Sequence, residues 1–296
     1  MRALLLTFLL LAVLAASAGE EKWQWWNDLH GWKSGMPGWR NWMIISPAYL
    51  GPNALPVPEV KNGLIPTETE IDLTVSNHFL RGDITQDLSG RLLVPFAKGK
   101  VAVEMYGVAF ERFAFSEEIR NKRFARDQDG KGIMTGDFYF STLVQLIKGR
   151  QFPNTLLRMA VKTASGYQEA ARYTDTPGYF FDVSFSKTWE TPSGMWRPFG
   201  TIGFYSWQSY DEDVPQNDAT LYALGIETQQ KRWLLSSSLS GYSGYKNIGD
   251  RPVQLNFSLR RESPRHAFRL QYLHGLRDWK YKTIKISYIL KFHGVN

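Results

Sequence analysis

The chain has 296 residues, of which 43% are hydrophobic and 15% aromatic, and it contains no cysteine. The lack of cysteine excludes a small secreted domain stapled by disulfides and an N-terminus anchored through a lipid-modified cysteine. The net charge of +7 comes from Lys and Arg residues spread along the chain, so it gives no argument for binding nucleic acid.

The N-terminus has the three parts of a secretory signal peptide. Arg2 supplies the positive charge, residues 3–16 form an apolar run, and Ala16-Ser17-Ala18 is a small-residue cleavage pattern. An N-terminal anchor helix is the alternative, but the flanks of the run are short for one. We therefore expect residues 1–18 to be a signal peptide that is removed on export. No later stretch reaches the ~18 apolar residues that a spanning helix needs.

Residues 19–66 form a separate region that is rich in tryptophan. Six of the eleven Trp residues lie in it: Trp23, Trp25, Trp26, Trp32, Trp39 and Trp42. Tryptophan favours a membrane–water interface, because its ring is apolar while its N–H needs a polar partner. We expect this segment at the periplasmic mouth of a membrane protein or inside its lumen. A leader packed on the rim, and stacking of the Trp rings on carbohydrate, are the alternatives. Five prolines within 46–66 predict an extended connector.

From Thr67 onward, apolar and polar residues alternate with period 2, which predicts β-strands because successive strand side chains point to opposite faces. Gly107, in the third segment, is expected to mark a β-bulge, because the alternation is less clean after it. Twelve segments can be placed: 68–79, 87–96, 100–115, 133–146, 155–164, 179–190, 195–207, 219–229, 231–242, 253–261, 267–275 and 280–292.

The connections between these segments alternate in length. Long polar connections occupy residues 116–132, 165–178, 208–218 and 243–252. Most of the connections between them are short turns. Membrane barrels alternate short periplasmic turns with longer outer loops, and they have an even number of strands when both ends lie on one side. Residues 67–292 are therefore predicted to form an all-β, antiparallel transmembrane barrel of about twelve strands.

With these features the chain resembles Gram-negative outer-membrane β-barrel proteins. The resemblance covers the signal peptide and residues 67–292, and it is one of pattern, with no motif that indicates a specific family. It implies location in the outer membrane. It also implies outer-membrane lipid, lipopolysaccharide and, during biogenesis, the outer-membrane insertion machinery as partners.

The last segment is similar to the C-terminal strand that the insertion machinery reads. Lys285, Tyr288 and Phe292 match that pattern, whereas Ser287 stands where Gly is usual. Residues 293–296 follow as a short tail.

The sequence has no phosphate-binding loop and no zinc spacing, so we predict no cofactor and no metal. Residues 127–130 are similar to the start of a calcium loop but lack its later ligands, so we expect a polar turn there.

The polar faces of the predicted strands indicate which side chains line the lumen. They are Glu70, Asp72, Arg91, Glu104, Asp137, Arg158, Lys162, Asp182, Arg260, Arg269, Lys285 and Lys291. Charges of both signs would orient a small polar or charged solute in a pore. The alternative is a set of salt bridges in a closed barrel, because buried ions need partners. The first and last strands are expected to pair, which would bring Glu70 and Asp72 near Lys285 and Lys291.

Ser76 and His78 are two residues apart and share one strand face, an arrangement in which His can activate Ser as a nucleophile. Some twelve-stranded outer-membrane barrels are lipid hydrolases with Ser and His at strand ends. Any Ser-x-His sequence gives this pattern, so no catalytic residue is assigned. The leading interpretation is a channel or transporter for small polar or charged solutes. The alternatives are a lipid-modifying hydrolase that uses Ser76 and His78, and a non-catalytic surface or assembly barrel.

Overall fold

The computed structural model describes residues 22–149 and 151–293. The predicted signal peptide, 1–18, and the predicted tail residues 294–296 lie outside these ranges. The chain divides into two units, Met1–Met43 and Ile44–Asn296, and each is described by itself. In the described ranges, no helix combines the length and the apolar character needed to cross a membrane.

The first unit contains a helix over residues 22–30 and a short 3-10 helix, η1 (Trp39–Trp42). The indole of Trp26 lies between the two, with its ring centroid 4.7 Å from that of His30 and 6.1 Å from that of Trp42. Aromatic rings at such separations attract each other beyond the area they bury. The membrane-interface role expected for the six Trp residues stays a prediction.

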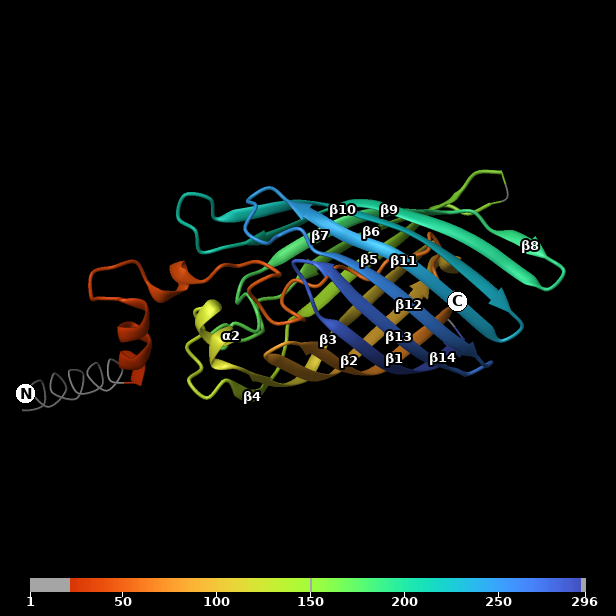
Figure 1. The fold of residues 1–296 in the computed structure, drawn as a ribbon. Helices are drawn as coiled ribbons and strands as arrows, with labels where there is room; N and C mark the ends of the chain where they lie inside the picture. The colour runs from red at the N-terminus through yellow and green to blue at the C-terminus, as the bar shows by residue number, and fades with distance from the viewer. Residues whose placement is uncertain (1–21, 150, 294–296) are drawn as a thin grey trace, which may run out of the picture. The chain divides into compact units, whose positions relative to one another are not determined.

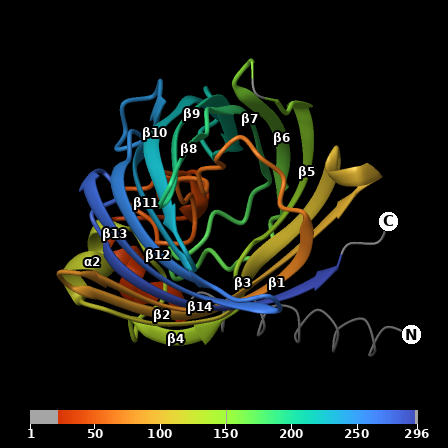
Figure 2. The ribbon, with the colours of Figure 1, turned by 90° about the vertical axis from the view of Figure 1, so that its right-hand side faces the viewer.

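The second unit is a closed antiparallel β-barrel, as the alternation predicts. Within the described residues, twelve strands follow one another around the wall in chain order, and β14 pairs with β1 to close it (Figures 1 and 2). These strands are β1 (Glu68–Leu80), β2 (Asp83–Phe96), β3 (Val101–Phe115), β5 (Phe138–Ile147), β6 (Asn154–Lys162), β7 (Gly178–Ser186), β9 (Gly194–Gln208), β10 (Gln216–Gln230), β11 (Trp233–Gly244), β12 (Val253–Glu262), β13 (His266–Arg277) and β14 (Lys282–His293).

The connections gather at two ends of the barrel (Figure 1). The long-loop end carries α2 (Glu117–Lys122) and β4 (Lys131–Met134), which pairs with β3, together with the β6–β7, β9–β10 and β11–β12 loops. The short-turn end carries η2 (Ala97–Gly99) and β8 (Trp189–Thr191), which pairs with β9. Strand β1 begins at the short-turn end. Its antiparallel partner β14 ends there, so the first and the last strand of the barrel have their outer termini at the same end.

The bulge in β3 falls at Ala109, and the expectation for Gly107 is wrong. The residues on either side of Ala109 pair with consecutive residues of β2, so Ala109 is the extra residue. An extra residue shifts the alternation by one, so Glu104 faces inward before the bulge and Glu111 faces inward after it. Gly107 has a packing role instead, because a Cβ there would lie 2.6 Å from the ring of Phe138.

The strands depart most from the predicted segments at three places, and the other boundaries shift by three residues or fewer. The second strand begins at Asp83, well before 87–96, because Gly82 adopts φ +80° and allows a two-residue turn after β1. The predicted segment 133–146 is split into β4 and β5, and the predicted segment 179–190 into β7 and β8. Short interruptions of this kind leave the period-2 pattern almost unchanged, so the sequence does not reveal them.

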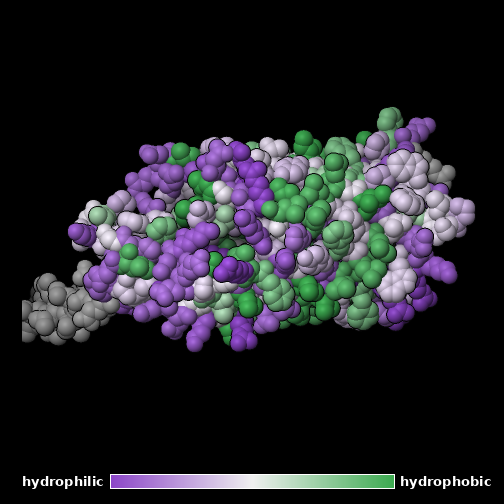
Figure 3. Space-filling model, viewed as in Figure 1, coloured by the Kyte–Doolittle hydropathy of each residue, from purple (hydrophilic) through white to green (hydrophobic). Residues whose placement is uncertain are grey.

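The outward face of the barrel wall is apolar. Exposed side chains on it include Leu73 on β1, Ile202 on β9, Leu224 on β10 and Ile286 on β14, whereas Ile289 points inward and is fully buried. Figure 3 shows apolar side chains gathered over the strands and polar ones over the loops. Water would disfavour such a continuous apolar surface, but hydrocarbon matches it.

Residues 44–66, which we call the lumen segment, run through the inside of the barrel (Figure 2, orange). At the long-loop end, the N–H of Ala48 donates to Gly249 and the N–H of Gly51 donates to Ala171. At the short-turn end, the N–H of Ile65 donates to the side-chain oxygen of Gln145 at 2.9 Å. The chain therefore enters the lumen at the long-loop end and reaches β1 at the short-turn end.

Aromatic side chains of the barrel satisfy carbonyl groups of the lumen segment. Tyr242 donates its hydroxyl to the carbonyl of Leu55 at 2.8 Å, and Trp279 donates its N–H to the carbonyl of Pro52 at 3.0 Å. Within the segment, hydrogen bonds are turn contacts such as those from the N–H of Tyr49 to Ser46 and from that of Ala54 to Gly51. The buried carbonyls of Pro52 and Leu55 therefore need donors from the barrel. Prolines within the segment reduce the number of N–H groups that also need a partner.

Replacement of Tyr242 by Phe tests this hydrogen bond. We expect Tyr242→Phe to lower the free energy of unfolding by about 1–3 kcal/mol, because the Leu55 carbonyl would stay buried without its donor. Tyr288→Phe, on the outward face of β14, is the control and should change it by less than about 0.5 kcal/mol. Denaturant titration of the refolded protein measures both values. Equal effects of the two changes would contradict the role of Tyr242.

Candidate functional site

A cavity of about 190 Å³ lies between the middle of the lumen segment and the inner wall of the barrel. Both charge signs line it, and they balance within the described part of the chain. The five carboxylates and five cationic side chains are Glu59, Asp72, Asp87, Glu104, Asp137, Lys61, Arg91, Arg158, Arg269 and Lys285. We take this cavity as the candidate site, since it is a partly open space lined by charged side chains beside the chain that fills the lumen.

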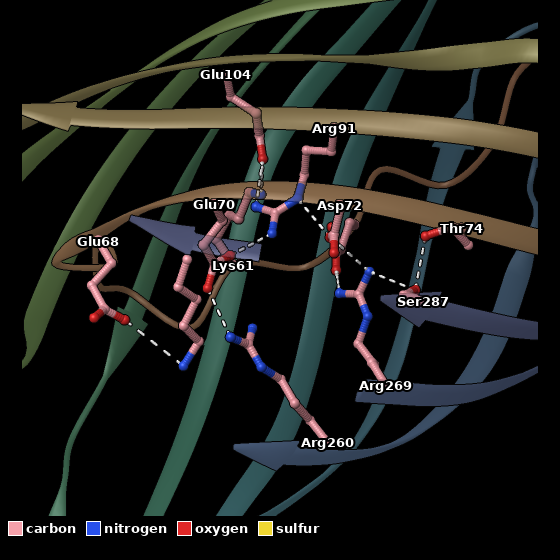
Figure 4. A network of polar contacts seen from close by, with 12 residues as sticks. Lys61, Glu68, Glu70, Asp72, Thr74, Arg91, Glu104, Arg260, Arg269 and Ser287 are labelled. Carbon is pink, nitrogen blue, oxygen red and sulfur yellow. Dashed lines mark hydrogen bonds and ion pairs between the residues drawn. The ribbon is translucent and has the colours of Figure 1, made fainter. Parts of the chain in front are cut away.

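Arg91 holds three carboxylates together on the inner wall (Figure 4). Its Nη2 lies 2.5 Å from Glu70, its Nε 3.0 Å from Asp72 and its Nη1 3.3 Å from Glu104. A guanidinium can do this because its donors are arranged in a planar fork, which a lysine lacks. Arg91 thereby connects β1, β2 and β3.

Each of the three carboxylates has a second cationic partner. Glu70 accepts from Arg260 at 2.7 Å, Asp72 from Arg269 at 3.2 Å and Glu104 from Lys61 at 2.7 Å. Figure 4 shows these contacts converging from β1, β2, β3, β12 and β13. Because Lys61 belongs to the lumen segment, the same network fastens that segment to the wall. We call this set the Arg91 network.

Strands β1 and β14 pair as predicted, with Glu70 directly opposite Lys291. Glu70 and Asp72 nevertheless form their ion pairs with arginines. The register places Ile289 opposite Asp72, while Lys291 pairs with Glu262 and, at 3.8 Å, with Glu68 at the start of β1. An arginine reaches more than one carboxylate at once, so the arginines of β2, β12 and β13 satisfy these buried acids better than two lysines would.

Four other predicted lumen residues form two separate buried ion pairs. The Nη2 of Arg158 lies 2.6 Å from Asp182 on the neighbouring strand. The Nζ of Lys162 lies 2.7 Å from Asp137 and also donates to the hydroxyl of Thr174 at 2.8 Å. The first pair binds β6 to β7, and the second binds β6 to the residue that precedes β5. The hydrogen bond to Thr174 binds β6 to the β6–β7 loop.

Ser76 and His78 are both buried, but they do not form a nucleophile–base pair. The ring of His78 is engaged through Nδ1 with the Thr283 hydroxyl at 2.8 Å and through Nε2 with Asp87 at 2.6 Å. Across the described ranges, the hydroxyl of Ser76 has no hydrogen-bond partner. Activation of a serine requires a base within hydrogen-bond reach, so this geometry gives no support to a hydrolase.

A second ionic cluster, missed by the sequence reasoning, lies at the long-loop end. Arg172 donates to Glu111 at 2.7 Å and to Asp83 at 2.8 Å, and Asp83 also accepts from Arg123 and Tyr281, both at 2.6 Å. We call these five residues the loop-end cluster. Burial opposes the charge of Arg172, but the two carboxylates raise the pKa of its guanidinium above the ordinary value. It is therefore a permanent cation in the interior.

The loop-end cluster also binds the lumen segment. Asn53 donates to Glu111 at 2.8 Å and to Asp87 at 3.1 Å. The cluster escaped prediction because Glu111 follows the bulge, Asp83 precedes the predicted second strand, and its arginines lie in loops without periodicity.

The predicted polar turn at 127–130 has a side-chain hydrogen bond, from the N–H of Gly130 to Asp127 at 2.9 Å. In the ranges that the structure describes, no group of three or more His, Asp and Glu side chains is arranged to hold a metal ion.

Comparisons with known proteins identify the fold. No family model and no curated protein matches the chain. An outer-membrane channel from Pseudomonas putida F1 is similar at a TM-score of 0.53 and 12% identity, covering 80% of this chain and 100% of that chain. The NanC porin gives 0.49 and 9% over 75% of this chain and 100% of that chain. The β domain of the Bordetella autotransporter BrkA gives 0.46 and 12% over 77% and 100%. The chain has the fold of an outer-membrane β-barrel.

Removal of the Arg91 guanidinium tests the central network. We expect Arg91→Met to lower the free energy of unfolding by about 3–5 kcal/mol, because three buried carboxylates lose a shared partner. Arg91→Lys should lose less, since it keeps the charge without the fork. Arg265→Met, at an exposed position, is the matched control. Denaturant unfolding followed by tryptophan fluorescence gives the values, and a loss no larger than that of the control would refute the network.

Proposed function

We propose that the protein is an outer-membrane channel for small polar or charged solutes, and that the lumen segment controls passage through it. The observation that carries the proposal is the charged cavity beside the lumen segment. Solutes cross such barrels through a polar interior, and charges of both signs on opposed surfaces orient them. The fold and the apolar outward face support a location in the outer membrane, with lipid around the strands.

The contacts of the lumen segment differ along its length. Near the short-turn end, Ile65 is buried in an apolar cluster with Leu93, Ala102, Leu143 and Leu156. Further along, Lys61 and Asn53 hold the segment through ion pairs and hydrogen bonds. Polar contacts exchange readily with water, whereas separation of apolar surfaces does not. At the other end of the segment, Ile45, Leu50 and Leu55 are also buried. The segment is thus anchored at both ends and can shift between them, where it borders the cavity.

The filled lumen favours a second candidate, a non-conducting surface or assembly barrel. In that case the lumen segment would be a permanent part of the core. Lipopolysaccharide at the long loops, and the insertion machinery reading the last strand, stay predicted partners under both candidates.

Conductance in planar lipid bilayers distinguishes the two candidates. The double variant Lys61→Met/Asn62→Leu removes the ion pair of Lys61 with Glu104 and the hydrogen bonds of Asn62 to Glu227. Glu104 retains its ion pair with Arg91, and Glu227 retains its ion pair with Arg197. The barrel should therefore stay folded while the segment is loosened. We expect a several-fold increase in mean conductance or open time over the unaltered chain.

Lys131→Met, at an exposed position of β4, is the control for this experiment and should conduct as the unaltered chain does. If the loosened variant, the control and the unaltered chain are all without conductance, the channel proposal is wrong and the surface barrel stands.

Cysteine labelling tests the orientation of the lumen segment. The chain has no cysteine of its own, so each introduced one is unique. We propose that the long loops face the exterior. Ala48→Cys and Lys131→Cys should then react with a membrane-impermeant maleimide on intact cells, Ala48→Cys more slowly because it is half-buried. Lys98→Cys, at the short-turn end, should react only after lysis. The reverse pattern would overturn the orientation.

A further inference from the structure

A groove of about 800 Å³ lies on the outward face of the barrel, across strands β2, β3, β5, β6 and β7. Most of the side chains that line it are apolar, among them Met105, Phe140, Met159 and Phe181. Ligand sites in proteins have volumes of roughly 300–1,000 Å³, so the groove is large enough to hold a ligand. It opens to the lipid side of the wall, whereas the charged cavity lies in the lumen.

The outward side chains of this groove are less exposed than those elsewhere on the wall. Leu92 of β2 and Leu157 of β6 point outward but are half-buried. By contrast, Ile202 of β9 and Leu224 of β10 are 59% and 73% exposed. The surface of the wall is therefore hollowed where the groove lies.

Thr142 of β5 lies between Val103 of β3 and Met159 of β6 in the groove. It is the smallest outward side chain of the groove, so it leaves a space that its larger neighbours enclose. Atoms that line an unfilled space lose dispersion contacts. An apolar chain that lies in the groove restores these contacts.

Three lysines lie on the two adjacent turns beyond the groove, at the short-turn end. Lys98 and Lys100 connect β2 to β3, and Lys148 follows β5. The two turns are neighbours, because the N–H of Gln145 donates to the carbonyl of Lys100 at 2.8 Å. All three lysines are exposed, and within the described chain none of them forms an ion pair. Neither turn contains an acidic residue, so this rim of the barrel is positively charged.

The basic rim lies close to the apolar groove. Val103 is three residues from Lys100, which is about 10 Å along a strand. Beside Lys148, the apolar side chains of Ile147 and Phe152 are 42% and 65% exposed. Cationic and apolar side chains together are typical of a surface at the membrane interface, where the lysine carbon chain contacts apolar surface and the ammonium group stays in water.

We propose that this groove binds an anionic glycerophospholipid, with an acyl chain against Thr142 and the phosphate group at Lys98, Lys100 and Lys148. Lysines near a membrane surface attract anionic headgroups, and each adds to the attraction. In the orientation proposed above, the short-turn end faces the periplasm, so the lipid belongs to the periplasmic leaflet. The site goes beyond the channel function, since a conducting and a non-conducting barrel would both carry it.

A second copy of the chain fits the groove less well than a lipid does. In a symmetric dimer the same surface of both copies must be complementary to itself, and a concave groove is not. An acyl chain is flexible and adapts to the hollow. The positive rim also favours a ligand with a negative charge, which an uncharged apolar solute lacks.

Native mass spectrometry of the full chain in detergent micelles tests the proposal. The probes are phosphatidylglycerol, which is anionic, and phosphatidylcholine, which has no net charge, with identical acyl chains. We expect the first phosphatidylglycerol molecule to bind at least tenfold more tightly than the first phosphatidylcholine molecule. The triple variant Lys98→Gln/Lys100→Gln/Lys148→Gln should lose this preference.

The matched control for the lysines is Lys131→Gln/Lys280→Gln/Lys282→Gln, which removes the same charge at exposed positions of the long-loop end. It should retain the preference for phosphatidylglycerol. Equal binding of the two lipids by the unaltered chain, or an equal loss of preference in both triple variants, would refute the headgroup site.

Thr142→Trp examines the groove independently of the lysines, because a large side chain there fills the hollow. It should weaken binding of the first phosphatidylglycerol molecule at least tenfold. Thr220→Trp, at an exposed outward position of β10, is the control and should leave binding unchanged. If Thr142→Trp binds the lipid as the unaltered chain does, the acyl chain does not occupy the groove. A dimer that only Thr142→Trp disrupts, with no lipid preference, would assign the groove to a second copy and overturn the proposal.

Discussion

Arg91 makes the contact on which the interior of the barrel depends, because it bonds the carboxylates of Glu70, Asp72 and Glu104 at once. Buried carboxylates of like charge would repel one another and resist burial, and a shared guanidinium removes both costs. Each carboxylate also pairs with a second cation. Arg260 and Arg269 of the wall pair with Glu70 and Asp72, and Lys61 of the lumen segment pairs with Glu104. Wall and segment are therefore parts of one electrostatic arrangement.

The lumen segment and the barrel wall satisfy each other's buried polar groups. Its carbonyls accept from Tyr242 and Trp279, while its Lys61 and Asn53 neutralise or bind carboxylates of the wall. Removal of the segment would leave polar groups unpaired on both sides, which explains why a chain with five prolines lies ordered in the lumen. The same polar character allows the contacts to be exchanged for water or for a solute.

The alternation of residues predicts the wall of this barrel well. In β14, Ile284, Ile286 and Tyr288 point outward, and the pairing of β14 with β1 follows from closing an even set of strands. Glu104 and Glu111 show where this reasoning stops. Both face inward, but the bulge at Ala109 lies between them. The break in the alternation indicates a bulge in this strand but places it at Gly107, because the pattern does not fix which residue is the extra one.

Which opposite charge a buried side chain pairs with depends on residues that are distant in the sequence. A local sequence pattern therefore does not predict these pairs. Arg172 reaches Asp83 and Glu111 across the barrel from a loop, at sequence separations of 89 and 61 residues. Similarly, the proximity of Arg269 to Asp72 depends on the curvature of the closed wall. Strand periodicity gives the face of a side chain, but long-range register and loop path decide which opposite charge it meets.

The central claim is that residues 44–66 form an ordered part of the barrel interior. Amide hydrogen exchange of the membrane-embedded protein measures this most directly, because the N–H groups of Gly51 and Ile65 donate to Ala171 and Gln145. We expect both amides to exchange at least a hundredfold more slowly than those of exposed loop residues such as Glu212 and Asp213. Exchange of Gly51 and Ile65 as fast as in those loops would show that the segment does not occupy the lumen.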